Sequence, residues 1–394
     1  MDWRIVLVVG MLSTGADSVA AASDLTIISF GRSDQKALVK AYYAPFRRAT
    51  GIGVKSLSYD GETTELEEMV KRGRTVWDVM QVESGLLQLG CQNGLFEKLD
   101  YNHIGRKNDF IPGAVSECGV GMFAWSMALA YDADRVKGKP SSWADFWDVK
   151  AFPGKRGLRR TAKYTLEIAL LADGVAPGDV YKMLATQEGV DRAFRKLDEI
   201  KGVVVWWEAA PQPTEFLKAG RMVMTSAYTL WIDREQKRKK NFKVAWDGSI
   251  YDVDSWAVPK GTPKTAEAYR FIAFASKPEN QKAFSQQLAY GPTSRKALSL
   301  LDTEAAGQMP SAGANLQKAV RLDVAFWIAH GEDLEKRFDT WAPPICKQQE
   351  EDEDEYDEQP SCQDIRGNAR RLKEGETAVH RHGHTHKDGE SDTH

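Results

Sequence analysis

Strand-like and helix-like patterns alternate from residue 25 onward, and this alternation constrains the fold more than any other feature of the chain. Residues 25–30 form a short apolar, β-branched run typical of a buried strand, and apolar side chains then recur at helical spacing over residues 38–46. Residues 53–59 and 77–82 are strand-like again, with a helical pattern over 63–72 between them. Strands separated by helices pair through crossover connections, so the sequence predicts an open α/β sheet with parallel units.

The same alternation continues to about residue 290, without an internal repeat. We expect strands over 123–131, 203–207, 222–226, 242–246 and 254–258, and helices over 164–173, 191–200, 265–276 and 279–288. An open α/β sheet binds its ligands beyond the carboxyl ends of its strands. The site is therefore expected close to the residues that follow four strand ends, at Phe30, Val82, Trp207 and Ser226.

Length and charge set further limits. A chain of 394 residues is too long for one ordinary domain of roughly 100 to 200 residues, so two units are expected. The net charge of −3 provides no general attraction to nucleic acid or to anionic membranes, and no nucleic-acid partner is expected. From Pro343 onward 14 acidic and 7 basic residues give −7, which leaves +4 for the rest. Residues 343–394 therefore differ from the body.

The N-terminus has the order of a secretory signal. Arg4 precedes the apolar run Ile5–Leu12, and small residues follow up to Ala22. We expect residues 1–22 to be a signal peptide cleaved near Ala22, with export to the periplasm; the alternative is a short buried helix or strand. The chain has no run of about 20 apolar residues that would span a membrane.

Export also bears on the four cysteines. An oxidising compartment favours disulfides, and we expect Cys91 to pair with Cys118; two buried thiols are the alternative. We favour Cys346 with Cys362 as a second pair, on either side of an acidic run.

Residues 343–394 have no apolar periodicity, so we expect a disordered acidic and His-rich tail. Neutral imidazoles bind zinc, nickel or copper, and the alternative is a biased composition without function. The candidate metal ligands are His380, His382, His384 and His386.

Motifs of enzymes and cofactor sites are missing from the sequence. It contains no G-x-S-x-G, H-E-x-x-H, Walker loop or G-x-G-x-x-G after a strand, and the body has only His103 and His330 for a triad or a zinc site. We therefore expect neither catalysis nor a cofactor. Instead, aromatic side chains and carboxylates gather close to predicted strand ends, which is the chemistry of an amine pocket. The alternative is that these aromatic residues belong to the core.

Four segments carry a resemblance to a known family. Residues 141–148 (SSWADFWD), 152–157 (FPGKRG), 249–259 (SIYDVDSWAVP) and 290–293 (YGPT) resemble extracellular solute-binding proteins of ABC importers, in particular the spermidine/putrescine-binding periplasmic proteins. The likeness covers about residues 25–341. It implies a monomeric type II periplasmic binding protein, in which two α/β lobes joined by crossover strands enclose a ligand cleft. Residues 23–131 with 254–303 would form lobe 1, and 132–253 with 304–342 would form lobe 2.

The resemblance also implies a set of ligand-binding residues. Asp254, at the opening of the predicted strand 254–258, matches the aspartate that grips the amine, and Tyr290 matches a tyrosine in a late loop. An aromatic after the first strand corresponds to Phe30, and a polar contact after the third strand corresponds to Ser84. Tyr228 and Asp252 stand where the family has tryptophans, and Glu208 stands where it has a serine. The two carboxylates that hold the far amine in the family are replaced near Thr161 and Tyr164, which argues against spermidine itself.

These observations together predict a periplasmic substrate-binding protein that captures a small cationic amine and delivers it to ABC permease subunits. The alternatives are a binding protein for another solute, such as an amino acid, an opine or a metal ion, or an exported enzyme that uses the same cleft.

Overall fold

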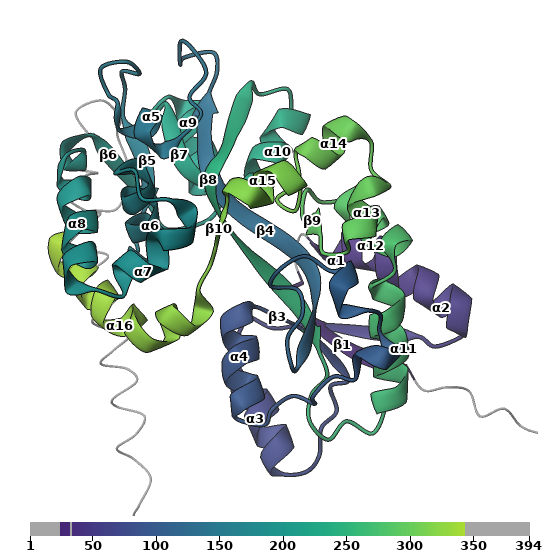
Figure 1. Cartoon of the computed structure of the whole chain (residues 1–394). Coiled ribbons are helices and arrows are strands. Elements are labelled where there is room, and N and C mark those ends of the chain that lie inside the picture. The colour runs from purple at the N-terminus through teal and green to yellow at the C-terminus, as the bar shows by residue number, and fades with distance from the viewer. Residues whose placement is uncertain (1–23, 32–33, 343–394) are drawn as a thin grey trace, which may run out of the picture. The chain divides into compact units, whose positions relative to one another are not determined.

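The computed structural model describes residues 24–31 and 34–342, shown in Figure 1. By its internal contacts the chain divides into residues up to Glu332 and residues from Asp333 onward, and helix α16 (Val324–Trp341) contributes to both parts. Within the described ranges, every helix lacks the length or the apolar character that a bilayer crossing requires.

The strands of the described part form one mixed sheet in the order β2-β1-β3-β8-β4-β7-β5-β6, with β9 beside β4 and β10 beside β8. Their bounds are β1 Leu25–Ser29, β2 Val54–Ser58, β3 Val79–Val82, β4 Gly119–Asp132, β5 Arg156–Arg159, β6 Val204–Trp207, β7 Met224–Tyr228, β8 Phe242–Ala257, β9 Gly291–Pro292 and β10 Val320–Arg321. The outer strands pair in parallel, as the helical crossovers require, whereas β4 pairs antiparallel with both β8 and β7. The α/β class is confirmed.

The helices lie between these strands along the chain. Their bounds are α1 Gln35–Leu38, α2 Ala44–Thr50, α3 Thr64–Lys71, α4 Ser84–Gln92, α5 Trp143–Trp147, α6 Ala162–Ala172, α7 Val180–Leu184, α8 Gln187–Asp198, α9 Gln212–Ala219, α10 Thr229–Lys237, α11 Thr265–Ala275, α12 Pro278–Ser285, α13 Arg295–Ser299, α14 Thr303–Gly307 and α15 Gly313–Lys318. A π-helical turn, Val39–Tyr43, joins α1 to α2, so the predicted helix over 38–46 is one nearly continuous element.

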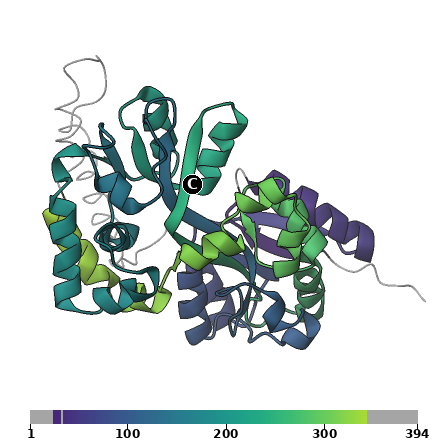
Figure 2. The same cartoon turned by 45° about the horizontal axis from the view of Figure 1, so that its top comes forward.

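Strands β4 and β8 connect two groups of elements. Figures 1 and 2 show them passing from a group with β1, β3 and helices α1–α4 to a group with β5–β7 and helices α5–α9. The separate strands expected over 242–246 and 254–258 are in fact one strand of 16 residues, and this expectation was wrong. Strand β8 remains paired with β4 on both sides of Gly248, and the pairing absorbs irregularities through register shifts at Gly121/Phe123 and Met127/Leu129.

A buried arginine fixes the start of β5. Arg156 is fully buried, and its guanidinium donates hydrogen bonds to the carbonyl oxygens of Phe146 (Nε, 2.6 Å), Gly154 (Nη1, 2.6 Å) and Phe152. It therefore gathers the end of α5 and the preceding loop around one planar group. Strand β5 is not among the predicted strands, because it has only four residues, of which two are arginines.

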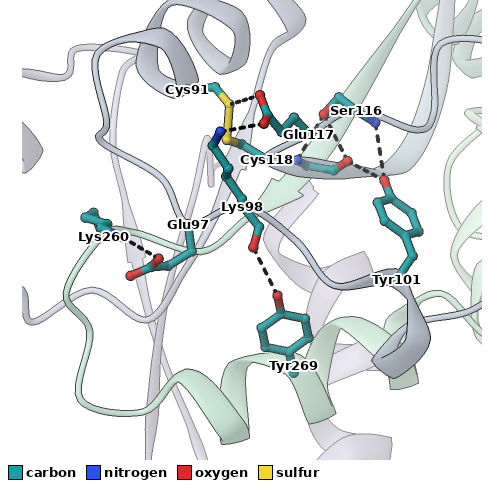
Figure 3. The surroundings of a disulfide bond; sticks show 10 residues. Cys91, Glu97, Lys98, Tyr101, Ser116, Glu117, Cys118, Lys260 and Tyr269 are labelled. Atoms are coloured by element: carbon teal, nitrogen blue, oxygen red, sulfur yellow. Dashed lines mark hydrogen bonds and ion pairs between the residues drawn. A yellow bond between two sulfur atoms is a disulfide. The ribbon is translucent and has the colours of Figure 1, made fainter.

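The expected pairing of Cys91 with Cys118 is confirmed. The disulfide joins α4 to the residue before β4, across a sequence separation of 27 residues (Figure 3). Beside it, Lys98 Nζ lies 2.7 Å from Glu117 Oε1, and the Tyr101 hydroxyl donates to the Gly119 carbonyl at 2.7 Å. The proposed partners Cys346 and Cys362 lie outside the described residues.

Candidate functional site

Two aspartates and a tryptophan share one face of the central strand pair. On β8, Asp252 is the cross-strand partner of Trp125 on β4, and Asp254 lies two residues further along, so all three side chains lie on the same face. The Trp125 indole Nε1 donates to Asp254 Oδ1 at 3.1 Å, and Gln81 Nε2 on β3 donates to Oδ2 at 2.8 Å. Asp254 therefore lies inside a strand and is held by donors from two neighbouring strands, instead of at a strand opening.

The carboxyls in this group disfavour one another's charge. Burial, and then the nearby charges of Glu83 and Asp252, raise the pKa of Asp254 well above its usual range. Burial raises the pKa of Asp252 to about 6, although the Ser84 hydroxyl donates a hydrogen bond to its Oδ2 and opposes the rise. The nearby charge of Lys163 already lowers the pKa of Asp252 in part, and a ligand cation beside Asp254 would relieve the remaining repulsion, so this end of the site favours an ammonium.

Three aromatic rings from different elements meet beside the aspartates. The Trp125 ring centroid lies 5.6 Å from that of Tyr228, at the end of β7, and 6.1 Å from that of Tyr164, in α6. Tyr164 and Tyr228 are 6.5 Å apart, and all three contacts are edge-to-face. The predicted residues Tyr164 and Tyr228 thus do come together, and Trp125, which the sequence analysis did not select, joins them to Asp254.

A guanidinium occupies the other end of this aromatic group. Arg159, the last residue of β5, donates from Nη1 to the Tyr228 hydroxyl at 2.8 Å. Its Cζ lies 5.5 Å from the ring centroid of Tyr164, 5.8 Å from that of Trp207 and 5.9 Å from that of Tyr228. Its Nε is buried without a hydrogen-bond partner, and among the described residues no carboxylate forms an ion pair with it. The side chain therefore retains the capacity to bind an anion.

Arg159 was missed by the sequence analysis because β5 was not recognised as a strand. Arg159 ends a parallel strand, and the carboxyl ends of such strands were where a site was expected. A strand assignment over Arg156–Arg159 would have directed attention to it.

Two further predicted residues lie at the edge of the group. Phe30 stacks on Tyr59 with centroids 4.9 Å apart, and the Tyr59 hydroxyl donates to the Gln81 carbonyl at 2.6 Å. Tyr290 stacks on Phe123 at 4.0 Å, and its hydroxyl lies 3.4 Å from the Asp34 carboxylate. The charge of Asp254 adds to the raised pKa of Tyr59 after the larger effect of burial, and to that of Tyr290 after burial and the charge of Asp34, so Tyr59 and Tyr290 lie near the aspartate.

Thr161 and Glu208 differ in their positions. Thr161 precedes α6, and its hydroxyl donates to the Lys163 carbonyl at 2.8 Å, so it supports the backbone next to Tyr164. Glu208 follows β6 and is exposed, and the structure gives its carboxylate no contact with the other predicted residues of the described part. Its assignment to the site stays a prediction.

Several expectations concern residues outside the described ranges. These are the signal peptide over residues 1–22, the tail over 343–394 and the four candidate metal ligands His380, His382, His384 and His386. Within the described part, no group of three or more histidine, cysteine or acidic side chains could hold a metal ion.

Comparison with known proteins supports the resemblance. The family model described as bacterial extracellular solute-binding protein matches residues 41–311. The γ-aminobutyric acid-binding protein of Pseudomonas aeruginosa is 50% identical over 84% of this chain and 94% of its own. An ABC transporter substrate-binding protein from Bradyrhizobium japonicum has a TM-score of 0.73 and 33% identity, covering 82% of this chain and all of its own. The solved structure of a GABA receptor has a TM-score of 0.70 and 30% identity, and the match covers 81% of this chain and 97% of the receptor chain.

Proposed function

Because the chain belongs to the bacterial extracellular solute-binding proteins, we propose that its site captures a small zwitterion with one ammonium and one carboxylate at opposite ends. The fold is that of type II periplasmic binding proteins, and the related proteins are substrate-binding proteins of ABC importers, not enzymes. The protein is thus a solute-binding protein that serves an ABC importer, and the proposal concerns its ligand. The lobe boundaries given above, the periplasmic monomer and the cleaved signal peptide remain part of the proposal.

The position of the Arg159 guanidinium is the observation that supports this proposal most directly. A pocket for a diamine needs carboxylates at both ends, whereas here carboxyls stand at one end and a guanidinium at the other. A second ammonium next to Arg159 would be repelled, and a carboxylate there would form a charge-assisted, bidentate pair. We therefore narrow the expected cationic amine to an amine that also carries a carboxylate.

Strand order indicates how far apart the ligand charges must be. Asp254 on β8 and Arg159 on β5 are separated by β4 and β7, and three strand spacings amount to about 14 Å between backbones. Trp125 donates to Asp254 and contacts Tyr228, which in turn accepts from Arg159, so these two rings lie between the two charged groups. An α-amino acid has one carbon between its charged groups and is too short to serve both.

γ-Aminobutyrate has three carbons between its ammonium and carboxylate, which separates them by roughly 5 Å at ordinary bond lengths. The Pseudomonas aeruginosa relative is named for this ligand, and so is the solved receptor. We therefore propose γ-aminobutyrate, or an ω-amino acid of similar length, as the ligand.

Isothermal titration calorimetry with γ-aminobutyrate, putrescine, butyrate and L-alanine tests the proposal. We expect γ-aminobutyrate to bind at least tenfold more tightly than the other three. Arg159→Gln should weaken it by about 2 to 5 kcal/mol, or at least thirtyfold, because a buried charge pair loses one partner. The matched control is Arg106→Gln, since Arg106 is 87% exposed and should leave affinity unchanged. If putrescine bound as tightly as γ-aminobutyrate and Arg159→Gln had no effect, the zwitterionic ligand would be contradicted, and a simple amine would be the favoured ligand.

A further inference from the structure

The backbone at Tyr164 adopts a conformation that non-glycine residues rarely show. Lys163 has φ −58° and ψ 131°, and Tyr164 has φ 75° and ψ −41°, which resembles the centre of a type II turn. The second central position of such a turn favours glycine. Among the described non-glycine residues, positive φ occurs only at Tyr164 and Lys239. A large side chain at this position needs an explanation from its surroundings.

The surroundings of Tyr164 hold this turn on both sides. The Thr161 hydroxyl donates to the Lys163 carbonyl at 2.8 Å, and the Thr165 hydroxyl donates to the Arg159 carbonyl at 2.8 Å. The second bond ties the first regular turn of α6 to the strand end that carries the guanidinium. The backbone strain at Tyr164 is therefore maintained by fixed neighbours, as is usual where strain serves a function.

The strained backbone places the Tyr164 ring against Arg159. The ring is 5% exposed, and the Arg159 Cζ lies 5.5 Å from its centroid. Trp207 and Tyr228 flank the same guanidinium at 5.8 Å and 5.9 Å. Three rings surround the guanidinium, but only Tyr164 comes from a helix whose start must bend to reach it.

We propose that Tyr164 is a positioning residue that determines specificity for the ligand carboxylate by holding Arg159 in place. The inference rests on the zwitterion proposed above. A glycine at position 164 would adopt the turn without strain, but one side of the Arg159 guanidinium would lose the ring that packs against it. The side chain of Arg159 would then gain freedom, and it would present its donors to a carboxylate less often.

A double-mutant cycle separates this role from a purely structural one. Affinity for γ-aminobutyrate is measured by calorimetry for Tyr164→Gly and Arg159→Lys, alone and combined. Tyr164→Gly should weaken binding at least tenfold in the natural background and less than twofold in the Arg159→Lys background, where no planar guanidinium remains to be positioned. Tyr164→Phe keeps the ring and should stay within threefold of the unaltered protein.

Two controls keep the outcome decisive. Lys239→Gly removes the other positive-φ side chain, which is exposed, and should leave the affinity unchanged. Tyr164→Asn replaces Tyr164→Gly if circular dichroism shows that the glycine variant does not fold, since asparagine tolerates positive φ. Equal losses in both backgrounds, or no loss, would overturn the role of Tyr164 while γ-aminobutyrate binding by the unaltered protein still stands. No binding by the unaltered protein would overturn the proposed function and this inference together.

Discussion

Replacing Asp254 by asparagine should weaken ligand binding without destabilising the ligand-free protein. The carboxyl is 4% exposed, and burial and neighbouring carboxyls raise its pKa well above the usual range, so its ionised form is costly to the fold. Asparagine removes the charge and still accepts from the Trp125 indole, and Gln81 can turn its amide to match the new group. Since neutral replacement of a buried charge is often neutral or stabilising, we expect an unchanged or higher free energy of unfolding.

The same substitution removes the anionic partner of the ligand ammonium. Losing one member of a buried, hydrogen-bonded charge pair typically costs about 2 to 5 kcal/mol, which is roughly thirtyfold to several thousandfold in affinity. Asparagine still offers a carbonyl oxygen, so the lower half of that range is expected. Calorimetry at pH 8 gives the affinity, and urea unfolding gives the stability. Asp109→Asn is the matched control, because the Asp109 side chain is 47% exposed and pairs with Arg106 at the surface.

The dependence of affinity on pH tests the same reasoning. The carboxyls of the free protein have raised pKa values, about 6 for Asp252, and an ammonium beside them would lower these values. At pH values below these pKa values, binding should then release protons, so affinity rises with pH by up to tenfold per unit for each proton released and levels off at higher pH. Titrations in buffers with different ionisation enthalpies count the protons. Equal affinity at pH 5.5 and pH 8, or undiminished binding by Asp254→Asn, would refute the account.

Three other predictions concern stability. Burial raises the pKa of Glu167 from 4.5 to about 7, so the folded protein binds a proton there more tightly than the unfolded chain, and the free energy of unfolding falls as pH rises through this window. Glu167→Gln should remove about 3 kcal/mol of that fall between pH 4.5 and 8, measured by urea unfolding. An unchanged dependence of stability on pH would contradict this prediction. Replacing Cys91 and Cys118 by serine should lower the free energy of unfolding by about 3 kcal/mol, because the disulfide closes a loop with a sequence separation of 27 residues and so restricts the unfolded chain. Denaturation midpoints under non-reducing conditions test this. A midpoint equal to that of the natural protein would exclude it. Arg156→Lys should cost about 1 to 3 kcal/mol, since the single nitrogen of lysine cannot reach all the carbonyls that three separate guanidinium nitrogens bond. A melting temperature equal to the natural protein's would disprove it.

The sequence predicted elements whose pattern is local, and it missed contacts that depend on register. Strands β1–β3 and helices α3, α6, α8, α11 and α12 agree with their predicted ranges within a few residues, because apolar periodicity alone indicates them, whereas the longest helix, α16, was not predicted. The contact of Trp125 with Asp254 depends on how β4 and β8 align over their whole length, and no local pattern encodes that alignment.

Two residues of the candidate site also show that the sequence does not predict contacts between distant strands. Asp254 accepts from the ring nitrogen of Trp125, which was not among the predicted residues, and its place in the middle of a 16-residue strand was not foreseen. Arg159 lies on a strand too short and too polar to show periodicity, and its importance appears only when three rings from β6, β7 and α6 surround it.

The hydrogen bond from Trp125 to Asp254 gives the protein an internal optical reporter. Indole emission shifts with the electric field along the ring, and here a carboxyl lies 3.1 Å from the ring nitrogen. A ligand ammonium beside that carboxyl would change this field, so capture of the solute would change the colour of emission without any attached dye. The chain has 12 tryptophans, and none of those in the described part is exposed, so a sensor built on this effect would keep Trp125 and first replace half-buried indoles such as Trp246 and Trp341, because those contribute background.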